Sequence, residues 1–229
     1  MTATEPATGT DLLDAVADLG AALRQSLEAS TSTTASAAQL REAAAGIRAA
    51  TAPLAALPRP YDKLPAVDDM ARAVRVFNPV VGVGSGVAVP LDLRPDPAGG
   101  GVVARAALGQ RYEGPPTFLH GGISALLMDQ VLGHAAIAAN RWGMTVGLDV
   151  RYRRPVPLHV TVRLAGRVAA IDGRRTTVVG TIAADDAPDV ALVEATAVFV
   201  SPSPEVAARY FAGVRTASGE QVSGRVGTG

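Results

Sequence analysis

The chain has 229 residues, and 48% of them are hydrophobic, which indicates a globular, soluble protein with a sizeable core. Its 21 basic and 21 acidic residues cancel, so the sequence carries no electrostatic signature of a nucleic-acid-binding protein. The lack of cysteine excludes disulfides, thiolate metal sites and a cysteine nucleophile. No apolar run is long enough to span a membrane and no secretory signal opens the chain, so we expect a cytoplasmic protein.

The N-terminal region, residues 1–74, is predicted to be a helical extension followed by a connector. Apolar residues recur at three- and four-residue spacing over residues 11–29, which is typical of an amphipathic helix. A Ser/Thr-rich break precedes a second, Ala-rich helical stretch over residues 37–50. We expect the prolines that follow to end helicity: Pro53, Pro58, Pro60 and Pro65. The two helices can dock on the main domain, pair with another chain or form a mobile arm. Docking or self-association is expected, because an exposed apolar helical face is a liability.

The central region, residues 75–201, reads as an α+β domain. Two runs resemble a β-hairpin, and a long apolar helix then precedes four further strands. This order fits an antiparallel sheet folded around a central helix. The C-terminal tail, residues 202–229, contains one possible helix over residues 204–214 and is otherwise expected to be partly disordered. The predicted hairpin strands are 84–93 and 102–108, the helix is 121–139, and the later strands are 145–153, 159–169, 175–184 and 191–200.

The segment from Tyr112 to Gly122 reads Tyr-Glu-Gly-Pro-Pro-Thr-Phe-Leu-His-Gly-Gly and leads into the apolar helix. Two glycines at a helix start let a substrate approach the backbone, and the free N–H groups of the first turn favour a negative oxygen. This is the requirement of an oxyanion hole, in which we expect the Gly122 N–H, aided by that of Gly121, to be the main donor. The helix is apolar nearly all round, which predicts that it is buried. Asp129 stands within this apolar run, where a carboxylate is costly unless it has a partner or a function.

Helix geometry separates these two features. Gly122 and Asp129 lie seven residues apart, which corresponds to roughly 10 Å along one helix. One carbonyl group cannot contact both. If both act on the same carbon atom, the carboxylate must come from a second, antiparallel copy of the helix, which predicts a dimer with shared sites.

This segment resembles the His-Gly-Gly motif of the hotdog-fold acyl-CoA thioesterases, in particular the phenylacetic-acid-pathway-like and thioesterase-superfamily-member branches. The resemblance covers about residues 75–201 and implies a hotdog fold. It also implies that Gly121 and Gly122 polarise the thioester carbonyl and that Asp129, nine positions after His120, is the catalytic carboxylate. The chain departs from many relatives at Thr117, where a glycine often precedes the histidine.

The resemblance assigns further residues. Thr145, sixteen residues after Asp129, matches a threonine that holds the attacking water. His120 is included in the candidate site, although a structural role in orienting the loop is favoured over a general-base role. Arg151, Arg153 and Arg154 are candidates for binding the phosphates of coenzyme A, because a guanidinium suits phosphate oxygens. A solvated strand end is an equally good explanation of these arginines.

The sequence therefore predicts a thioester hydrolase that releases a free acid and a thiol from acyl-CoA. It needs no cofactor other than the coenzyme A of its substrate, and the three histidines lack the spacing of a metal site. Asp129 acts either as a general base on water or as a nucleophile, and both routes remain open. The expected assembly is a homodimer, or a homotetramer built from two dimers. The alternative is an acyl-CoA or acyl-carrier binding module without turnover; a hotdog hydratase or dehydratase lacks the expected His and Asp arrangement.

Overall fold

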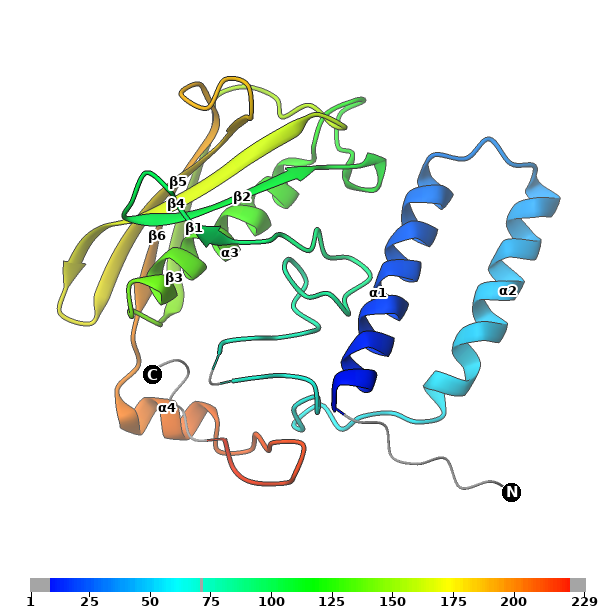
Figure 1. Cartoon of the computed structure of the whole chain (residues 1–229), viewed down its shortest axis with the longest axis horizontal. Helices are drawn as coiled ribbons and strands as arrows, with labels where there is room; N and C mark the ends of the chain where they lie inside the picture. The colour runs from blue at the N-terminus through cyan, green and yellow to red at the C-terminus, as the bar shows by residue number, and fades with distance from the viewer. Residues whose placement is uncertain (1–8, 71, 223–229) are drawn as a thin grey trace.

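The computed structural model describes residues 9–70 and 72–222. Two antiparallel helices, α1 (Gly9–Thr31) and α2 (Ala37–Ala55), lie beside an α+β domain. A long connector joins them to the domain and runs between the two parts (Figure 1). The described residues of this connector form no helix and no regular strand. None of the helices within the described ranges combines the length and hydropathy that crossing a bilayer requires.

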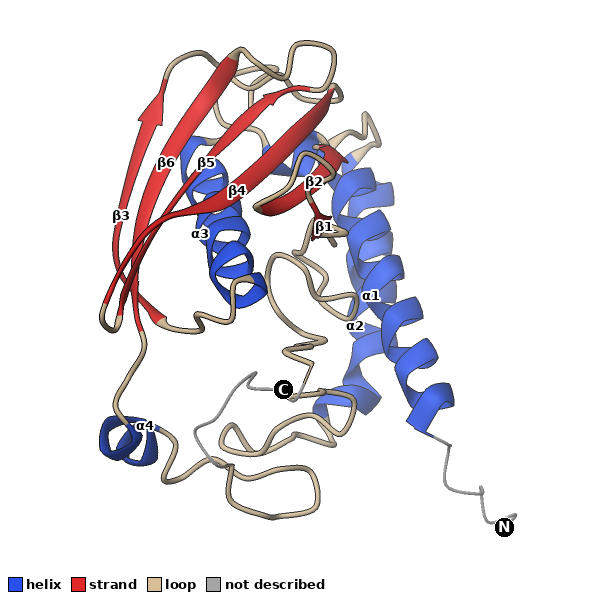
Figure 2. Ribbon diagram, turned by 60° about the vertical axis from the view of Figure 1, so that its left-hand side comes forward, coloured by secondary structure: helices blue, strands red, loops and turns tan. Residues whose placement is uncertain are grey.

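The domain consists of one antiparallel sheet of six strands that curves around the helix α3 (Gly121–Ala138), as Figure 2 shows. The strand order is β1-β2-β4-β5-β6-β3, so the three strands β4, β5 and β6 lie between the hairpin strand β2 and the strand β3. This arrangement confirms the predicted α+β class and hotdog fold. The strands are β1 (Arg94–Pro95), β2 (Gly101–Ala107), β3 (Met144–Tyr152), β4 (Thr161–Asp172), β5 (Arg175–Ala184) and β6 (Ala191–Val200).

The core lies between α3 and the concave face of the sheet. Leu127, Met128, Val131 and Leu132 of α3 are each at most 1% exposed, and they pack among alternating side chains of the strands. The alternation is visible in β6, where buried residues such as Val193, 0% exposed, alternate with more accessible ones over most of its length. Burial of one helix face against one sheet face fixes the direction in which the other face of α3 points.

The predicted first strand, residues 84–93, is wrong. That segment forms turns, and only the two residues of β1 pair with β2. Apolar side chains in the segment are consistent with a strand, but its glycines lie against α1. A Cβ atom on Gly86 would lie 3.0 Å from Cβ of Leu23. Close contact with a helix therefore replaces strand pairing in this segment.

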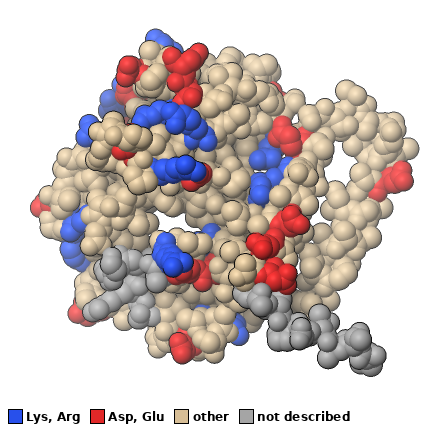
Figure 3. Space-filling model, viewed as in Figure 1, with Lys and Arg blue, Asp and Glu red and all other residues tan. Residues whose placement is uncertain are grey.

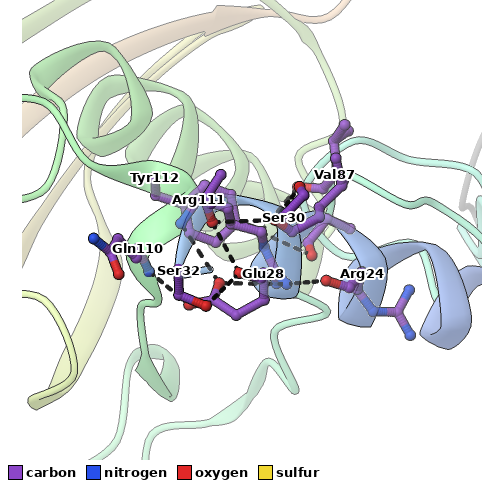
Figure 4. A network of polar contacts seen from close by, with 11 residues as sticks. Arg24, Glu28, Ser30, Ser32, Val87, Gln110, Arg111 and Tyr112 are labelled. Carbon is purple, nitrogen blue, oxygen red and sulfur yellow. Dashed lines mark hydrogen bonds and ion pairs between the residues drawn. The ribbon is translucent and has the colours of Figure 1, made fainter. Parts of the chain in front are cut away.

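The helix α1 is anchored to the domain by polar contacts at its C-terminal end (Figure 4). The Glu28 carboxylate accepts a hydrogen bond from the backbone N–H of Gln110 at 2.8 Å and lies 3.9 Å from the Arg111 guanidinium. Arg111 also donates to the Arg24 carbonyl oxygen at 2.9 Å, and Arg24 donates to the Val83 carbonyl oxygen at 2.7 Å. The predicted docking of the first helix is therefore confirmed.

The helix α2 shows a different outcome. It has no buried residue, and Figure 3 shows an open gap between it and the rest of the molecule in that view. The prediction that Pro53 ends helicity is wrong, because the helix continues to Ala55. Proline lacks the N–H that would bond to the preceding turn, but this loss is small when only two further residues follow.

The tail is more ordered than predicted. The helix α4 (Pro204–Tyr210) ends before Val214, and residues 211–222 return to the connector. The backbone N–H of Leu64 donates to the Arg215 carbonyl oxygen at 2.8 Å, and the Arg215 N–H donates to the Asp62 carbonyl oxygen at 2.9 Å. The predicted disorder of residues 223–229 lies outside the described residues.

Candidate functional site

The loop before α3 holds the histidine and the two glycines in place. The backbone N–H of His120 donates to the Tyr112 carbonyl oxygen at 2.9 Å. Thr117, the position that departs from many relatives, has a φ of 70°, a left-handed conformation that strains a β-branched residue. The Glu113 carboxylate accepts a hydrogen bond from the Thr117 N–H at 2.8 Å. A side-chain contact thus supports a backbone conformation that a glycine would adopt without strain.

His120 is the N-cap residue of α3. Its ring nitrogen Nδ1 accepts a hydrogen bond from the Gly122 N–H at 3.0 Å, which satisfies one of the free donors of the first turn. The Gly122 N–H is therefore already engaged, whereas the Gly121 N–H has no acceptor among the described residues. The histidine has a structural role in this arrangement, and the available backbone donor is that of Gly121.

Asp129 and Thr145 are brought together by the packing of α3 against β3. The Thr145 hydroxyl donates to a carboxylate oxygen of Asp129 at 2.9 Å. Asp129 is half-buried and Thr145 is exposed, so the pair is open to solvent. A hydroxyl that binds one carboxylate oxygen orients the carboxylate and leaves the second oxygen available. Residues sixteen positions apart in the sequence thus form one polar unit.

The expectation that α3 is buried on all sides is wrong for the described chain. Gly122 and Leu126 lie on its outer face, and Leu126 is 40% exposed. Asp129 lies on the same face, because residues three, four and seven apart fall close together on a helix. The sheet covers only one side of α3, so Gly122, Leu126 and Asp129 keep accessible surface within the described residues.

A groove of about 520 Å³ begins at the start of α3 and contains Gly121 in its lining. Arg153 and Arg154 also line it, whereas Arg151 does not. The Arg153 guanidinium donates to the Glu194 carboxylate at 2.8 Å. The Arg154 side chain has no hydrogen bond or ion pair within the described part of the chain, so its positive charge is available beside the helix N-terminus.

Arg151 is placed differently from the other two predicted arginines. Its guanidinium lies 3.3 Å from the Asp149 carboxylate on the exposed strand β3. Arg151 lies two residues before Arg153, but this spacing does not place it in the lining of the groove. Of the three predicted arginines, the structure brings two to the helix start.

Tyr152 was not predicted as a site residue. Its hydroxyl donates to the Gly121 carbonyl oxygen at 2.9 Å and thereby ties the end of β3 to the first turn of α3. Tyr152 also lines the groove that contains Gly121. The sequence offered no signal for this role, because the contact depends on how a strand end and a helix start meet.

A second polar group on α3 is structural. Gln130 and His134 are hydrogen-bonded through their side chains at 2.9 Å, and Asn78 donates to the Gln130 side chain at 2.8 Å. Burial lowers the pKa of His134, and a hydrogen bond with the Gln130 carbonyl opposes that shift. These contacts fix the connector against α3. Within residues 9–70 and 72–222, no group of three or more His, Asp or Glu side chains is placed to hold a metal ion.

Comparisons with known proteins extend the geometric observations. Residues 117–191 match the family model described as the thioesterase superfamily. The acyl-coenzyme A thioesterase THEM4 of Xenopus laevis is 35% identical over 42% of this chain and 43% of its own length. The THEM4 protein of Mus musculus is 35% identical over 42% of this chain and 41% of its own length. The match thus spans less than half of the length of these curated relatives.

A crystal structure of a thioesterase superfamily protein gives the more extensive match. It superposes with a TM-score of 0.71 and 32% sequence identity, over 81% of this chain and 90% of that protein. This coverage includes most of both chains and exceeds the segment that the family model matches. The chain therefore belongs to the thioesterase superfamily.

Proposed function

We propose that this protein hydrolyses acyl-CoA, or a related acyl thioester, to a free acid and a thiol. The observation that carries the proposal is the Asp129 carboxylate, held by the Thr145 hydroxyl at 2.9 Å on the open face of the helix that begins at Gly121. An acid, an orienting hydroxyl and an unengaged helix N-terminal donor are the groups that this reaction requires. The names of the relatives in frog and mouse support the same chemistry.

The Gly121 N–H polarises the thioester carbonyl in this proposal. It is the first donor of α3, and the helix dipole adds to its positive character. When an attacking oxygen adds to the carbonyl carbon, the carbonyl oxygen gains negative charge, and one preorganised donor typically contributes roughly 3 kcal/mol to its stabilisation. The cap formed by His120 holds the first turn in position for this contact.

Asp129 supplies the acid-base or nucleophilic step. As a general base it takes a proton from water while the water oxygen adds to the carbonyl carbon; the C–S bond then breaks and the thiolate leaves and takes up a proton. As a nucleophile its carboxylate oxygen adds to the carbonyl carbon, expels the thiolate and forms a mixed anhydride, which water then hydrolyses. In both routes Thr145 orients the carboxylate.

The complete site requires two chains in this proposal. Gly121 precedes Asp129 by eight residues, roughly 12 Å along α3, so both cannot contact one carbonyl group from the same helix. Among the described residues, the strand β3 pairs with β6 alone, and its other edge has no partner strand there. Met144 and Val146 on β3 are 44% and 57% exposed, an apolar edge that favours pairing with a second copy. Antiparallel pairing of two β3 strands would bring two α3 helices together along their open faces.

The groove beside Gly121 receives the thiol side of the substrate in this proposal. Arg154, together with Arg153, places positive charge at the groove, which suits the phosphates of coenzyme A. The chain carries no net charge that would attract an anion from a distance, so these local contacts must supply the attraction.

The proposal is tested by measuring thiol release from acyl-CoAs with the wild type and the Asp129→Asn variant. We expect the substitution to lower kcat by about 100-fold or more, because it removes the base while keeping the shape of the side chain. Asp172→Asn, at the exposed end of β4, is the matched control and should retain wild-type turnover. Full turnover by Asp129→Asn would exclude the proposed mechanism. Binding of acyl-CoA without thiol release by the wild type would instead support a binding module.

A further inference from the structure

A second cavity, mostly apolar, lies beside the first two turns of α3. It has a volume of about 270 Å³ and is lined by Ile123, Leu126 and Leu127 of α3 together with the C-terminal end of α1 and part of the connector. The groove that contains Gly121 has a different lining and does not share a residue with this cavity. The start of α3 therefore lines two separate sites, the groove that contains Gly121 and this apolar cavity.

The groove and the apolar cavity lie on different sides of the helix start. Successive residues of an α-helix are rotated by roughly 100°, so Ile123 and Leu126 point to a different side from Gly121 and Ser124, which line the groove. The exposed Gly122 lies between the two sides. A thioester whose carbonyl contacts the Gly121 N–H would have the charged groove on one side and the apolar cavity on the other.

The lining of the cavity suits a hydrocarbon chain. Its walls are mainly aliphatic and include Val87 and Val89 of the connector. Arg111 is the charged residue in the lining, and its charge is balanced by the Glu28 carboxylate at 3.9 Å and by the Tyr112 ring, whose centroid lies 4.7 Å away. Apart from the buried Arg111 Nε–H, which has no hydrogen-bond partner within the described residues, the lining offers a polar or charged ligand little compensation for the loss of its hydration.

The size of the cavity limits the length of that chain. An apolar protein cavity of about 150 Å³ holds one benzene molecule. The cavity beside α3 is about 270 Å³, so by proportion it holds on the order of ten carbon atoms. The volume thus matches a medium-length acyl chain.

The N-terminal extension supplies one end of the cavity. Leu27 and Thr31, in the last turns of α1, belong to the lining, and Glu28 between them anchors α1 to the backbone of Gln110. Tyr112 is also fixed, because its hydroxyl donates to the carbonyl oxygens of Val87 and Ala88, each at 3.0 Å. The walls are therefore held in place by contacts made within the chain.

We infer that this cavity binds the acyl chain of the substrate and that Leu27, through the docking of α1, limits its length. This inference rests on the proposed hydrolysis of acyl thioesters and adds a substrate class to it: unbranched aliphatic acyl groups of medium length. It gives the helix α1 a role in specificity, outside the segment that matches the family model.

The test compares kcat/KM for a series from butanoyl-CoA to hexadecanoyl-CoA in the wild type and in Leu27→Trp. The larger side chain should exclude the distal methylenes, and each buried methylene is worth roughly a fourfold change in affinity. We expect kcat/KM for decanoyl-CoA to fall by about tenfold and that for butanoyl-CoA to stay within about twofold. Val87→Phe reduces the cavity from the connector side without altering the sequence of α1 and should produce the same shift.

Leu19→Trp is the matched control, because Leu19 is an exposed leucine of the same helix outside the cavity lining. It should keep the wild-type chain-length profile. An unchanged profile in both Leu27→Trp and Val87→Phe would overturn the inference while leaving the hydrolase intact. If the wild type hydrolyses none of the substrates, the proposed function fails. Titration with the non-hydrolysable thioether S-decyl-CoA then tests whether the cavity binds an alkyl chain. Tenfold weaker binding of S-decyl-CoA by Leu27→Trp than by the wild type would support the inference. Equal binding by both proteins, or no binding by the wild type, would overturn the inference.

Discussion

The two N-terminal helices have 23 and 19 residues and both carry exposed leucines, yet α1 is fixed to the domain and α2 is not. The difference lies in contacts at specific positions. On α1, Gly20 permits close approach to the connector and Glu28 accepts backbone hydrogen bonds from the domain. On α2, a Cβ atom added at Gly46 would meet no atom of another segment within 4 Å, and Leu40, Ile47 and Leu54 remain 45–51% exposed. Helix formation and helix docking are therefore separate properties of this extension.

The largest expected effect comes from Gly20→Ala. A Cβ atom at this position would overlap the carbonyl oxygen of Val83, so either α1 or the connector must move. We expect the free energy of unfolding to fall by about 1–3 kcal/mol, the usual range for overpacking. Thermal and denaturant unfolding of the variant measure the loss, and faster amide exchange in α1 would show that docking is affected. Wild-type stability would mean that α1 is not closely packed at this point.

Glu28→Gln should have the next largest effect. The substitution keeps the size of the side chain and removes the charge that faces the Arg111 guanidinium and the Gln110 N–H. Since the Glu28 side chain is about one-third exposed, we expect a loss of about 1–2 kcal/mol in the free energy of unfolding. Glu42→Gln on the exposed helix α2 is the matched control and should leave stability unchanged. Equal effects of the two substitutions would remove the distinction between the helices.

Gly46→Ala should have the smallest effect, with the opposite sign to that of Gly20→Ala. An alanine in open space only raises helix propensity, which is worth about 0.5–1 kcal/mol in a helix interior. The gain should appear as slower amide exchange within α2, while the melting of the domain stays the same. Destabilisation by this substitution would show that α2 packs against a partner in solution.

Local sequence patterns predicted most of the elements. The predicted strands 175–184 and 191–200 coincide with β5 and β6, and the central helix begins at the predicted Gly121. These segments have a clear period and end at glycine or proline turns, so their structure depends on neighbouring residues. The connector strand 84–93 was wrong because its conformation depends on α1, about sixty residues earlier in the chain.

The candidate site likewise combines features that were visible in the sequence with features that depend on tertiary contacts. The seven- and eight-residue spacings from the glycines to Asp129 are visible in the sequence and already separate the oxyanion donor from the carboxylate. The sequence favoured the Gly122 N–H as the main donor. That the His120 ring accepts this N–H and leaves the Gly121 N–H available was not visible, because it depends on how the loop folds against the helix start. The role of Tyr152 was hidden for a similar reason, since its hydroxyl meets the start of α3 only after β3 and α3 have packed.

The sequence by itself determined the helix and strand order, the family resemblance and the set of residues able to carry out thioester chemistry. Hydrophobic period, glycine and proline positions and the His-Gly-Gly motif suffice for these, because each acts over a few neighbouring residues. Only the tertiary structure decided that Thr145 holds Asp129, that Gly121 keeps a free N–H and that α1 closes an apolar cavity beside the helix start. Each of these depends on contacts between segments distant in the chain, which form when the sheet covers one face of α3 and α1 docks beside it.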